Sequence, residues 1–336
     1  MAWWLPVIWA GLIAVAVLAY VLLDGFDLGV GILFAVEHDA EDRDVMVNTI
    51  APVWDGNETW LVLGGGGLFA VFPMAFAIVM PTFYPAVIAM LLALVFRGVA
   101  FEFRFRAARP SSRAWWDRAF LGGSAIAAFC QGTILGGLLQ GVKVAGGQYA
   151  GGWFDWLSPF TLLCGVAVVA GYALLGATWL IWRTEGVLQA SARRRAHGLG
   201  IAVLALIVAV SLWTPLLNPV FARRWFGFPG ILLTSPVPVL VALAAWGFWR
   251  GLARRSDVLP FLCVVAWFVL SYAGLGISVW PMMVPPSVTI WQAAAPVSSQ
   301  LFLLVGAVVL VPVILAYTGF AYWVFRGKVK AGAHYH

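Results

Sequence analysis

The sequence predicts an all-α integral membrane protein with nine transmembrane helices. Of its 336 residues, 63% are hydrophobic and only 10% are charged, and the mean hydropathy is +0.95. These values lie well outside the range of soluble domains. The apolar residues gather into runs of about 20, the length that a helix needs to cross the hydrocarbon core of a bilayer. The 19 tryptophans suit two belts at the membrane interfaces.

Nine apolar segments follow one another along the chain. They are 5–36, 59–79, 82–105, 119–142, 159–182, 198–217, 230–249, 258–280 and 298–325. The second begins in polar sequence and continues through a run of four glycines at 64–67. Its boundary with the third depends on Pro73 and Pro81, because proline interrupts a helix.

A short internal similarity predicts how the segments are grouped. YVLLDG at 20–25 resembles YALLGA at 172–177, four segments later. This spacing favours a single membrane domain, 1–336, built from two four-helix bundles and one peripheral helix. The expected bounds are 1–142 for the first half, 159–280 for the second, 298–325 for the ninth helix and 326–336 for a cytoplasmic tail.

Positive charges in the connections predict the orientation. If the N-terminus lies outside, the inner connections and the tail hold sixteen Arg and Lys residues. The outer connections then hold only Lys143, Arg223 and Arg224. The positive-inside rule therefore places the N-terminus in the periplasm and the C-terminus in the cytoplasm. The net charge of +6 reflects this topology, so we expect no nucleic-acid partner.

Two carboxylates interrupt the first segment. A charged Asp near the bilayer centre costs about 2.5–3.5 kcal/mol on insertion scales. Asp24 and Asp27 are three residues apart and share one helical face. Gly25 and Gly29 form a small-xxx-small pair that allows close approach of another helix. One interpretation is a buried, protonated packing patch, and the other is a face that handles protons or ions.

One arginine, Arg97, lies inside the third segment. The predicted orientation puts it at a depth similar to that of five carboxylates: Asp24, Asp27, Asp55, Glu58 and Glu102. An intramembrane Arg without a carboxylate partner would be very costly, and we expect Asp55 or Asp27 to be that partner. A buried ion pair that only fixes helix register is the alternative interpretation.

The first inner connection, 37–44, is unusually acidic. Its carboxylates are Glu37, Asp39, Glu41, Asp42 and Asp44. We expect a solvated loop, and a proton-collecting antenna at a channel mouth is the alternative.

The chain offers little redox or covalent chemistry of its own. Its histidines are His38, His197, His334 and His336, and none lies in the middle of a segment. A membrane subunit that binds several haems needs His or Met on facing helices, so we expect no redox centre and no metal site here. The cysteines are far apart and predict no disulfide.

Two classes of function remain. One is a proton-conducting or scaffold subunit of a larger redox complex. The other is a proton-coupled secondary transporter that uses the face of Asp24 and Asp27. Transporter sites lie near the midplane between repeats. Here the ionisable residues lie toward one side and the similar segment at 172–177 lacks them, which favours the first class.

Several long motifs resemble subunit II of the cytochrome bd-type quinol oxidases. They are LDGFDLGVG at 23–31, DVMVN at 44–48, APVWDGNETWL at 51–61 and FRGVAFEFR at 96–104. The resemblance covers the whole chain, and the detail at 54–60 is closest to the cyanide-insensitive branch.

The resemblance implies an electrogenic quinol:O2 oxidoreductase in the bacterial inner membrane, with this chain paired to a haem-bearing subunit I. Subunit I would ligate two b-type haems and one d-type haem, and the substrate would be a ubiquinone-type quinol. Small single-span subunits, lipid and a structural quinone are further expected partners. The family's proton path maps onto Asp27, Asp55 and Arg97, with Trp54 beside them. The depth argument adds Asp24, Glu58 and Glu102, and no residue is expected to do redox chemistry directly.

Overall fold

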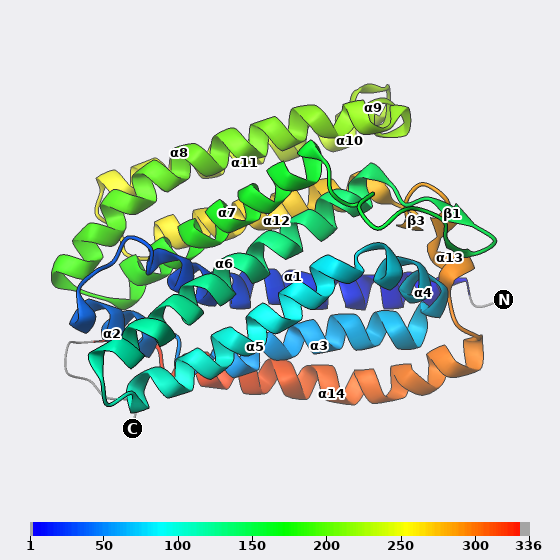
Figure 1. Ribbon diagram of the computed structural model, residues 1–336. Helices are drawn as coiled ribbons and strands as arrows, with labels where there is room; N and C mark the ends of the chain where they lie inside the picture. Colours follow the sequence, from blue (N-terminus) through cyan, green and yellow to red (C-terminus); the bar gives the residue numbers. More distant parts are fainter. Residues whose placement is uncertain (1–2, 330–336) are drawn as a thin grey trace.

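A computed structural model describes residues 3–329 as a bundle of long helices that run along a common direction (Figure 1). The long helices are α1 (Trp4–Leu33), α3 (Trp54–Val71), α5 (Tyr84–Arg106), α6 (Pro110–Gln140), α7 (Pro159–Arg183), α8 (Gly186–Leu217), α11 (Pro236–Ala253), α12 (Leu259–Val279) and α14 (Val297–Val324). The first helix, α1, begins at one end of the bundle, and the last helix, α14, ends at the other (Figure 1).

Short elements close the two ends. The helix α2 (Ala40–Asn48) lies at the end of the bundle where α14 ends, and we call this the α2 end. At the opposite end, here called the hairpin end, lie α4 (Pro73–Thr82), α9 (Pro219–Phe226), α10 (Gly230–Thr234), α13 (Ile290–Ala293) and the strands β1 (Val144–Ala145), β2 (Gln148–Tyr149), β3 (Met282–Val284) and β4 (Val288–Thr289). The strands form two antiparallel hairpins, in which Val144 pairs with Tyr149 and Met282 pairs with Thr289.

The described chain contains eight helices long and apolar enough to cross a membrane, and a ninth span if α3 and α4 count as one. The predicted number of spans is consistent with this. The second span is not straight, however, because α3 and α4 meet at 120°. The backbone leaves the helical region at Phe72 (φ −125°, ψ 59°), just before Pro73. The carbonyl of Val71 instead accepts a hydrogen bond from the Ala295 amide, 2.8 Å away.

Two helices extend beyond their apolar runs at the α2 end. The structure begins α6 at Pro110, where hydropathy places the start near 119, and α8 at Gly186, where hydropathy places it near 198. The additional turns are rich in arginine and lie outside the hydrophobic stretch. Hydropathy therefore located the membrane-spanning part of each helix and missed the polar turns that continue it.

Helices α1 and α7 cross almost backbone to backbone. A Cβ added to Gly29 would lie 1.9 Å from the Tyr172 carbonyl oxygen, and one added to Gly176 would lie 2.4 Å from the Gly29 carbonyl carbon. Gly25 is also close, because its Cβ would lie 2.8 Å from the Tyr172 ring. The close approach predicted for the glycine pair is confirmed. By contrast, α14 lies at the edge and Gln300 is its one buried residue.

Candidate functional site

A buried ion cluster lies where α1, α3 and α5 meet, in the half of α1 nearer the α2 end. Asp24 and Asp27 on α1 and Arg97 on α5 each have no solvent-exposed side-chain surface. Nη2 of Arg97 is 3.1 Å from Oδ1 of Asp24 and 4.0 Å from Oδ2 of Asp27. Its other terminal nitrogen, Nη1, is 3.6 Å from Oε2 of Glu58 on α3. One guanidinium group therefore contacts three carboxylates, which offsets the cost of burying its charge.

The indole of Trp54 covers the guanidinium group. Cζ of Arg97 lies 5.1 Å from the centre of the Trp54 ring, a cation–π distance. Trp54 and Glu58 are four residues apart on α3, so both point to the same side of that helix. The side chain of Glu58 is 28% exposed. The cluster thus runs from a fully buried pair of acids to a carboxylate at the protein surface.

Asparagine and tyrosine side chains form a second layer around the acids. Nδ2 of Asn57 donates to Oδ2 of Asp27 at 2.7 Å, and the hydroxyl of Tyr322 donates to Oδ1 of Asn57 at 2.9 Å. Tyr20 lies one turn before Asp24 on the same face of α1. The Tyr20 hydroxyl accepts a 2.8 Å hydrogen bond from Gln131, which ties α1 to α6.

Sequence reasoning did not select Tyr20, Asn57 or Tyr322 as site residues. Asn57 belongs to the 51–61 motif, and Tyr20 precedes Asp24 by four residues, so both carried a local signal. Tyr322 lies in a long apolar segment far along the chain, and only the folded arrangement brings it to the cluster.

The predicted site residues fall into two groups, those that contact Arg97 and those that point away from it. Asp27, an expected partner of Arg97, lies within ion-pair distance, but Asp24 is closer. Asp55 is exposed and forms no ion pair with Arg97 among the described residues. It directly follows Trp54, and one residue rotates the side chain by about 100° around a helix. Glu102 is also exposed, because its five-residue offset from Arg97 turns it to a different face of α5.

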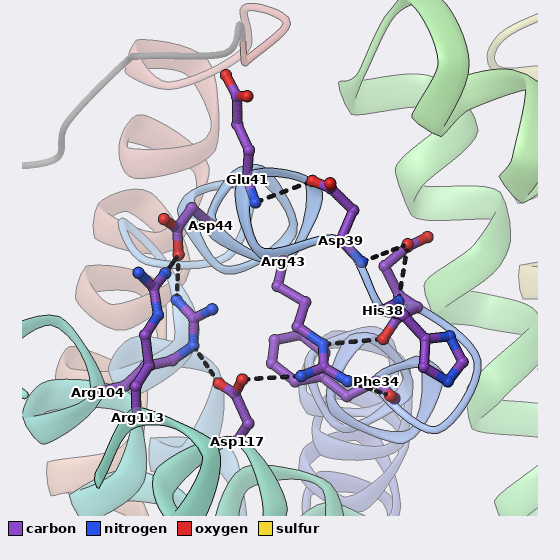
Figure 2. A network of polar contacts seen from close by, with 10 residues as sticks. Phe34, His38, Asp39, Glu41, Arg43, Asp44, Arg104, Arg113 and Asp117 are labelled. Carbon is purple, nitrogen blue, oxygen red and sulfur yellow. Dashed lines mark hydrogen bonds and ion pairs between the residues drawn. The ribbon is translucent and has the colours of Figure 1, made fainter. Parts of the chain in front are cut away.

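The acidic connection forms a second, ordered network at the α2 end (Figure 2). Asp44 binds Arg104, with Oδ1 2.5 Å from Nη1, and also binds Arg113. Asp117 binds Nε of Arg104 at 2.6 Å and Nη1 of Arg43 at 2.8 Å. The expectation of a solvated loop therefore holds for Asp39 and Glu41, which are exposed. It does not hold for Asp44, which lies on α2 and pairs with arginines of α5 and α6.

Other carboxylates of this connection have separate roles. The side chain of Asp39 accepts hydrogen bonds from the amides of Glu41 and Asp42 and caps the start of α2. Glu37 forms an ion pair with Arg195 of α8 at 2.8 Å. Partial burial, and next the charge of Glu37, raises the pKa of Asp42. Burial also acts to raise the pKa of Asp44, but hydrogen bonds from Arg113 and Arg104 outweigh it, and the pKa of Asp44 lies below its usual range.

These features define a class of protein. The chain is a polytopic helical membrane protein with a buried cluster of acids around one arginine. The two histidines of the described residues, His38 and His197, are both exposed.

Comparison with known proteins then gives the family. The profile of the cytochrome bd terminal oxidase subunit II family matches residues 5–325, and the chain belongs to this family. It is therefore a subunit of a quinol:oxygen oxidoreductase, a terminal oxidase of the respiratory chain. It is a multi-pass protein of the bacterial inner membrane.

Relatives from three bacteria match almost the whole chain. The cytochrome bd-I ubiquinol oxidase subunit 2 of Escherichia coli is 34% identical, with 97% of this chain and 94% of the relative covered. The probable cytochrome oxidase subunit 2 of Haemophilus influenzae is 30% identical, with 96% and 95% covered. The cytochrome bd ubiquinol oxidase subunit 2 of Bacillus subtilis is 29% identical, with 96% of each chain covered.

A solved structure shares the fold. A chain of the bd oxidase from Geobacillus thermodenitrificans superposes with a TM-score of 0.74, covering 96% of this chain and 98% of that chain at 17% identity. At this identity the likeness supports the architecture, while the family and the sequence relatives carry the function.

Proposed function

We propose that the cluster around Arg97 helps to deliver protons in a quinol oxidase, in which this chain pairs with a haem-bearing subunit I and also stabilises the complex. The enzyme would oxidise a ubiquinone-type quinol and reduce O2 to water with protons drawn from the cytoplasm. This chain would hold or move protons and would perform no redox step itself. The proposed pathway residues are Asp24, Asp27, Trp54, Asp55, Glu58, Arg97 and Glu102.

One observation carries the proposal: a single guanidinium group contacts two fully buried carboxylates and a third that reaches the surface. One positive charge cannot balance three negative ones in a medium that solvates charge poorly, so the cluster has room for a proton. Oδ1 of Asp27 is buried and accepts no hydrogen bond from the described residues, and it is the oxygen that we assign to proton uptake. Exposed Asp55 precedes Glu58 by three residues and marks the entrance.

We propose that this chain ligates no haem. Axial ligation needs His, Met or another donor directed at the iron from within the protein. His38 and His197 are exposed, and no group of three metal-binding side chains occurs among the described residues. His334 and His336 lie outside the described residues. We assign the two b-type haems and the d-type haem to subunit I and route no step of this chain through them.

We further propose that the α2 end faces the cytoplasm and the N-terminus the periplasm. The α2 end carries most of the arginines, among them Arg43, Arg104, Arg113 and Arg195 in ion pairs, and the positive-inside rule supports this orientation. Within one membrane domain, 1–142 and 159–280 would form the two four-helix halves and 298–325 the peripheral ninth helix. The tail would be 326–336, of which 330–336 lie outside the described residues. Small single-span subunits, lipid and a structural quinone remain proposed partners.

Substitution of two acids tests the proton role. In the purified complex, Asp27→Asn and Asp55→Asn should each lower quinol oxidase turnover by about tenfold or more, since acid–base groups typically contribute that much or more. The haem absorbance per complex should stay unchanged. Glu185→Gln, which alters an exposed carboxyl at the start of α8, is the matched control and should keep full turnover.

Two outcomes would contradict the proposal. Full turnover in both Asp variants would remove the proton role. Loss of haem together with turnover would instead indicate that the ion cluster only holds the subunits together. Solute uptake by the chain alone in liposomes would support the transporter alternative.

A further inference from the structure

The edge helix α14 makes one polar contact with the buried ion cluster. Most of α14 is exposed, yet the hydroxyl of Tyr322, close to its C-terminal end, donates to Oδ1 of Asn57 at 2.9 Å. Asn57 is itself 1% exposed. Its Nδ2 donates to Oδ2 of Asp27 at 2.7 Å and to the Leu23 carbonyl at 3.3 Å. A residue of the last helix is thus joined to the central carboxylate through one side chain.

The neighbours of Asn57 fix which way its amide points. A side-chain amide has two hydrogens on nitrogen and an oxygen that only accepts. The Leu23 carbonyl can only accept, so a reversed amide would place two oxygens against each other. On the other side, the Tyr322 hydroxyl, which can donate or accept, donates to the amide oxygen and holds the side chain in this orientation. The amide is therefore held so that it presents an N–H, and not an oxygen, to Asp27.

The Tyr322 ring is held in place by packing that does not involve its hydroxyl. It makes edge contacts with Phe26 and Trp179, with ring centres 6.4 and 6.3 Å apart. Phe26 in turn stacks on Trp179 at 4.1 Å. Edge contacts of this kind depend on the ring alone, so a Phe in place of Tyr322 would keep them.

The chain after α14 is also fastened to the α2 end. Arg183 of α7 donates to the Phe325 carbonyl, and the Val329 amide donates to the Arg183 carbonyl at 2.8 Å. Nζ of Lys328 lies 2.7 Å from Oδ2 of Asp257. These contacts limit sliding of α14 along the bundle and keep the Tyr322 hydroxyl at Asn57.

We propose that Tyr322 is a positioning residue for Asp27 that acts through Asn57, an inference that rests on the proposed proton role of Asp27. The hydroxyl sets the Asn57 amide, and the amide sets the orientation and hydrogen-bonding state of the Asp27 carboxyl. Without the hydroxyl, the buried amide oxygen loses its partner, and the Leu23 carbonyl alone holds the Asn57 side chain against Asp27.

The test compares two tyrosines of α14 in the purified, haem-loaded complex. Tyr322→Phe removes the hydroxyl and keeps the ring, and turnover should fall about three- to tenfold, as expected for one lost hydrogen bond. Tyr317→Phe is the matched control, because Tyr317 lies on the same helix and is 67% exposed. Its turnover should equal that of the wild type, and both variants should keep their haem absorbance.

An infrared difference spectrum separates positioning from general damage. The carboxyl band that Asp27→Asn removes should be displaced in Tyr322→Phe and unchanged in Tyr317→Phe. Wild-type turnover in Tyr322→Phe, an undisplaced band, or lost haem in that variant would each overturn the positioning role. Failure of the proton role itself looks different: Asp27→Asn would then retain turnover or remove no band, whatever Tyr322→Phe does.

Discussion

At the scale of single residues, the cluster depends on the shape of the arginine side chain. Arg97 directs Nη2 toward Asp24 and Asp27 and Nη1 toward Glu58 on the other side. The planar guanidinium group of arginine presents donors on separate nitrogens in a fixed geometry, whereas lysine ends in one compact ammonium nitrogen. The Trp54 ring lies over the same group, a geometry that favours arginine.

Replacing Arg97 with lysine therefore tests whether the shape of the guanidinium group is needed in addition to its positive charge. Arg97→Lys keeps the positive charge but loses the 3.6 Å ion-pair contact with Glu58. A contact of this kind at a partly exposed carboxylate is worth about 1 kcal/mol or less, so turnover should fall about two- to fivefold. Quinol oxidase turnover and the haem spectrum of the purified complex are the measurements. Arg106→Lys alters an exposed arginine in the last turn of the same helix and is the control.

If Arg97 served only to fix helix register, turnover in Arg97→Lys would fall in proportion to lost haem. Equal turnover in Arg97→Lys and the wild type would show that the bridge to Glu58 is not needed.

At the scale of elements, the crossing of α1 and α7 brings two helix backbones into direct contact. Gly29 and Gly176 let the two backbones touch, because a side chain at either position would overlap the facing backbone. The crossing also joins the two similar sequence segments, 20–25 and 172–177, of which only the first carries an acid.

A methyl group at this crossing should disrupt the fold. In Gly29→Ala, the new Cβ would lie 1.9 Å from a backbone oxygen, so the helices must separate. Overpacking of this kind costs about 1–3 kcal/mol or more. The yield of intact complex and its thermal unfolding midpoint should both fall. Gly11→Ala on the same helix is the control, because its Cβ would meet nothing within 4 Å. Equal midpoints for the two variants would show that α1 and α7 are not tightly packed here.

At the scale of the whole molecule, the sequence predicted the spans well and the side-chain partners only in part. Hydropathy located the membrane segments because burial in lipid demands about 20 apolar residues regardless of tertiary contacts. It could not predict the 120° bend after Phe72, which is stabilised by contact with the distant Ala295 amide. The predicted topology placed Asp55 and Glu102 at the depth of Arg97 but did not say which way their side chains point. Both are exposed, because of their positions around the helices α3 and α5.

Contacts between distant segments were the least predictable part of the site. The link from Tyr322 to Asn57 spans 265 residues, and nothing in the apolar pattern of α14 marks it. The ordered network at the α2 end was also hidden, because its acids and arginines come from three separate helices. A sequence read locally shows an acidic loop and several arginines, and only the fold shows that they neutralise one another.

That network should stabilise the whole molecule, because Asp44 and Asp117 join α2, α5 and α6 through the buried side chain of Arg104. Asp44→Asn leaves Arg104 with one carboxylate fewer, and the expected cost is about 1–3 kcal/mol of the free energy of unfolding. The thermal unfolding midpoint, measured near pH 7, should therefore be lower in Asp44→Asn than in the wild type. Glu41→Gln, on the same helix, is the control, since Glu41 is exposed and points away from the network (Figure 2).

The difference in unfolding midpoint between wild type and Asp44→Asn should depend on pH in a definite direction. The pKa of Asp44 is lowered in the folded protein, because the hydrogen bonds from Arg113 and Arg104 outweigh burial. Its stabilising contribution is therefore complete above the ordinary carboxyl pKa of about 4 and is lost as the pH falls through the lowered value. The gap in unfolding midpoint between wild type and Asp44→Asn should stay constant from pH 8 to about 5 and narrow only below about 4. A gap that narrowed between pH 7 and 5 would show that Asp44 is not held by its arginines.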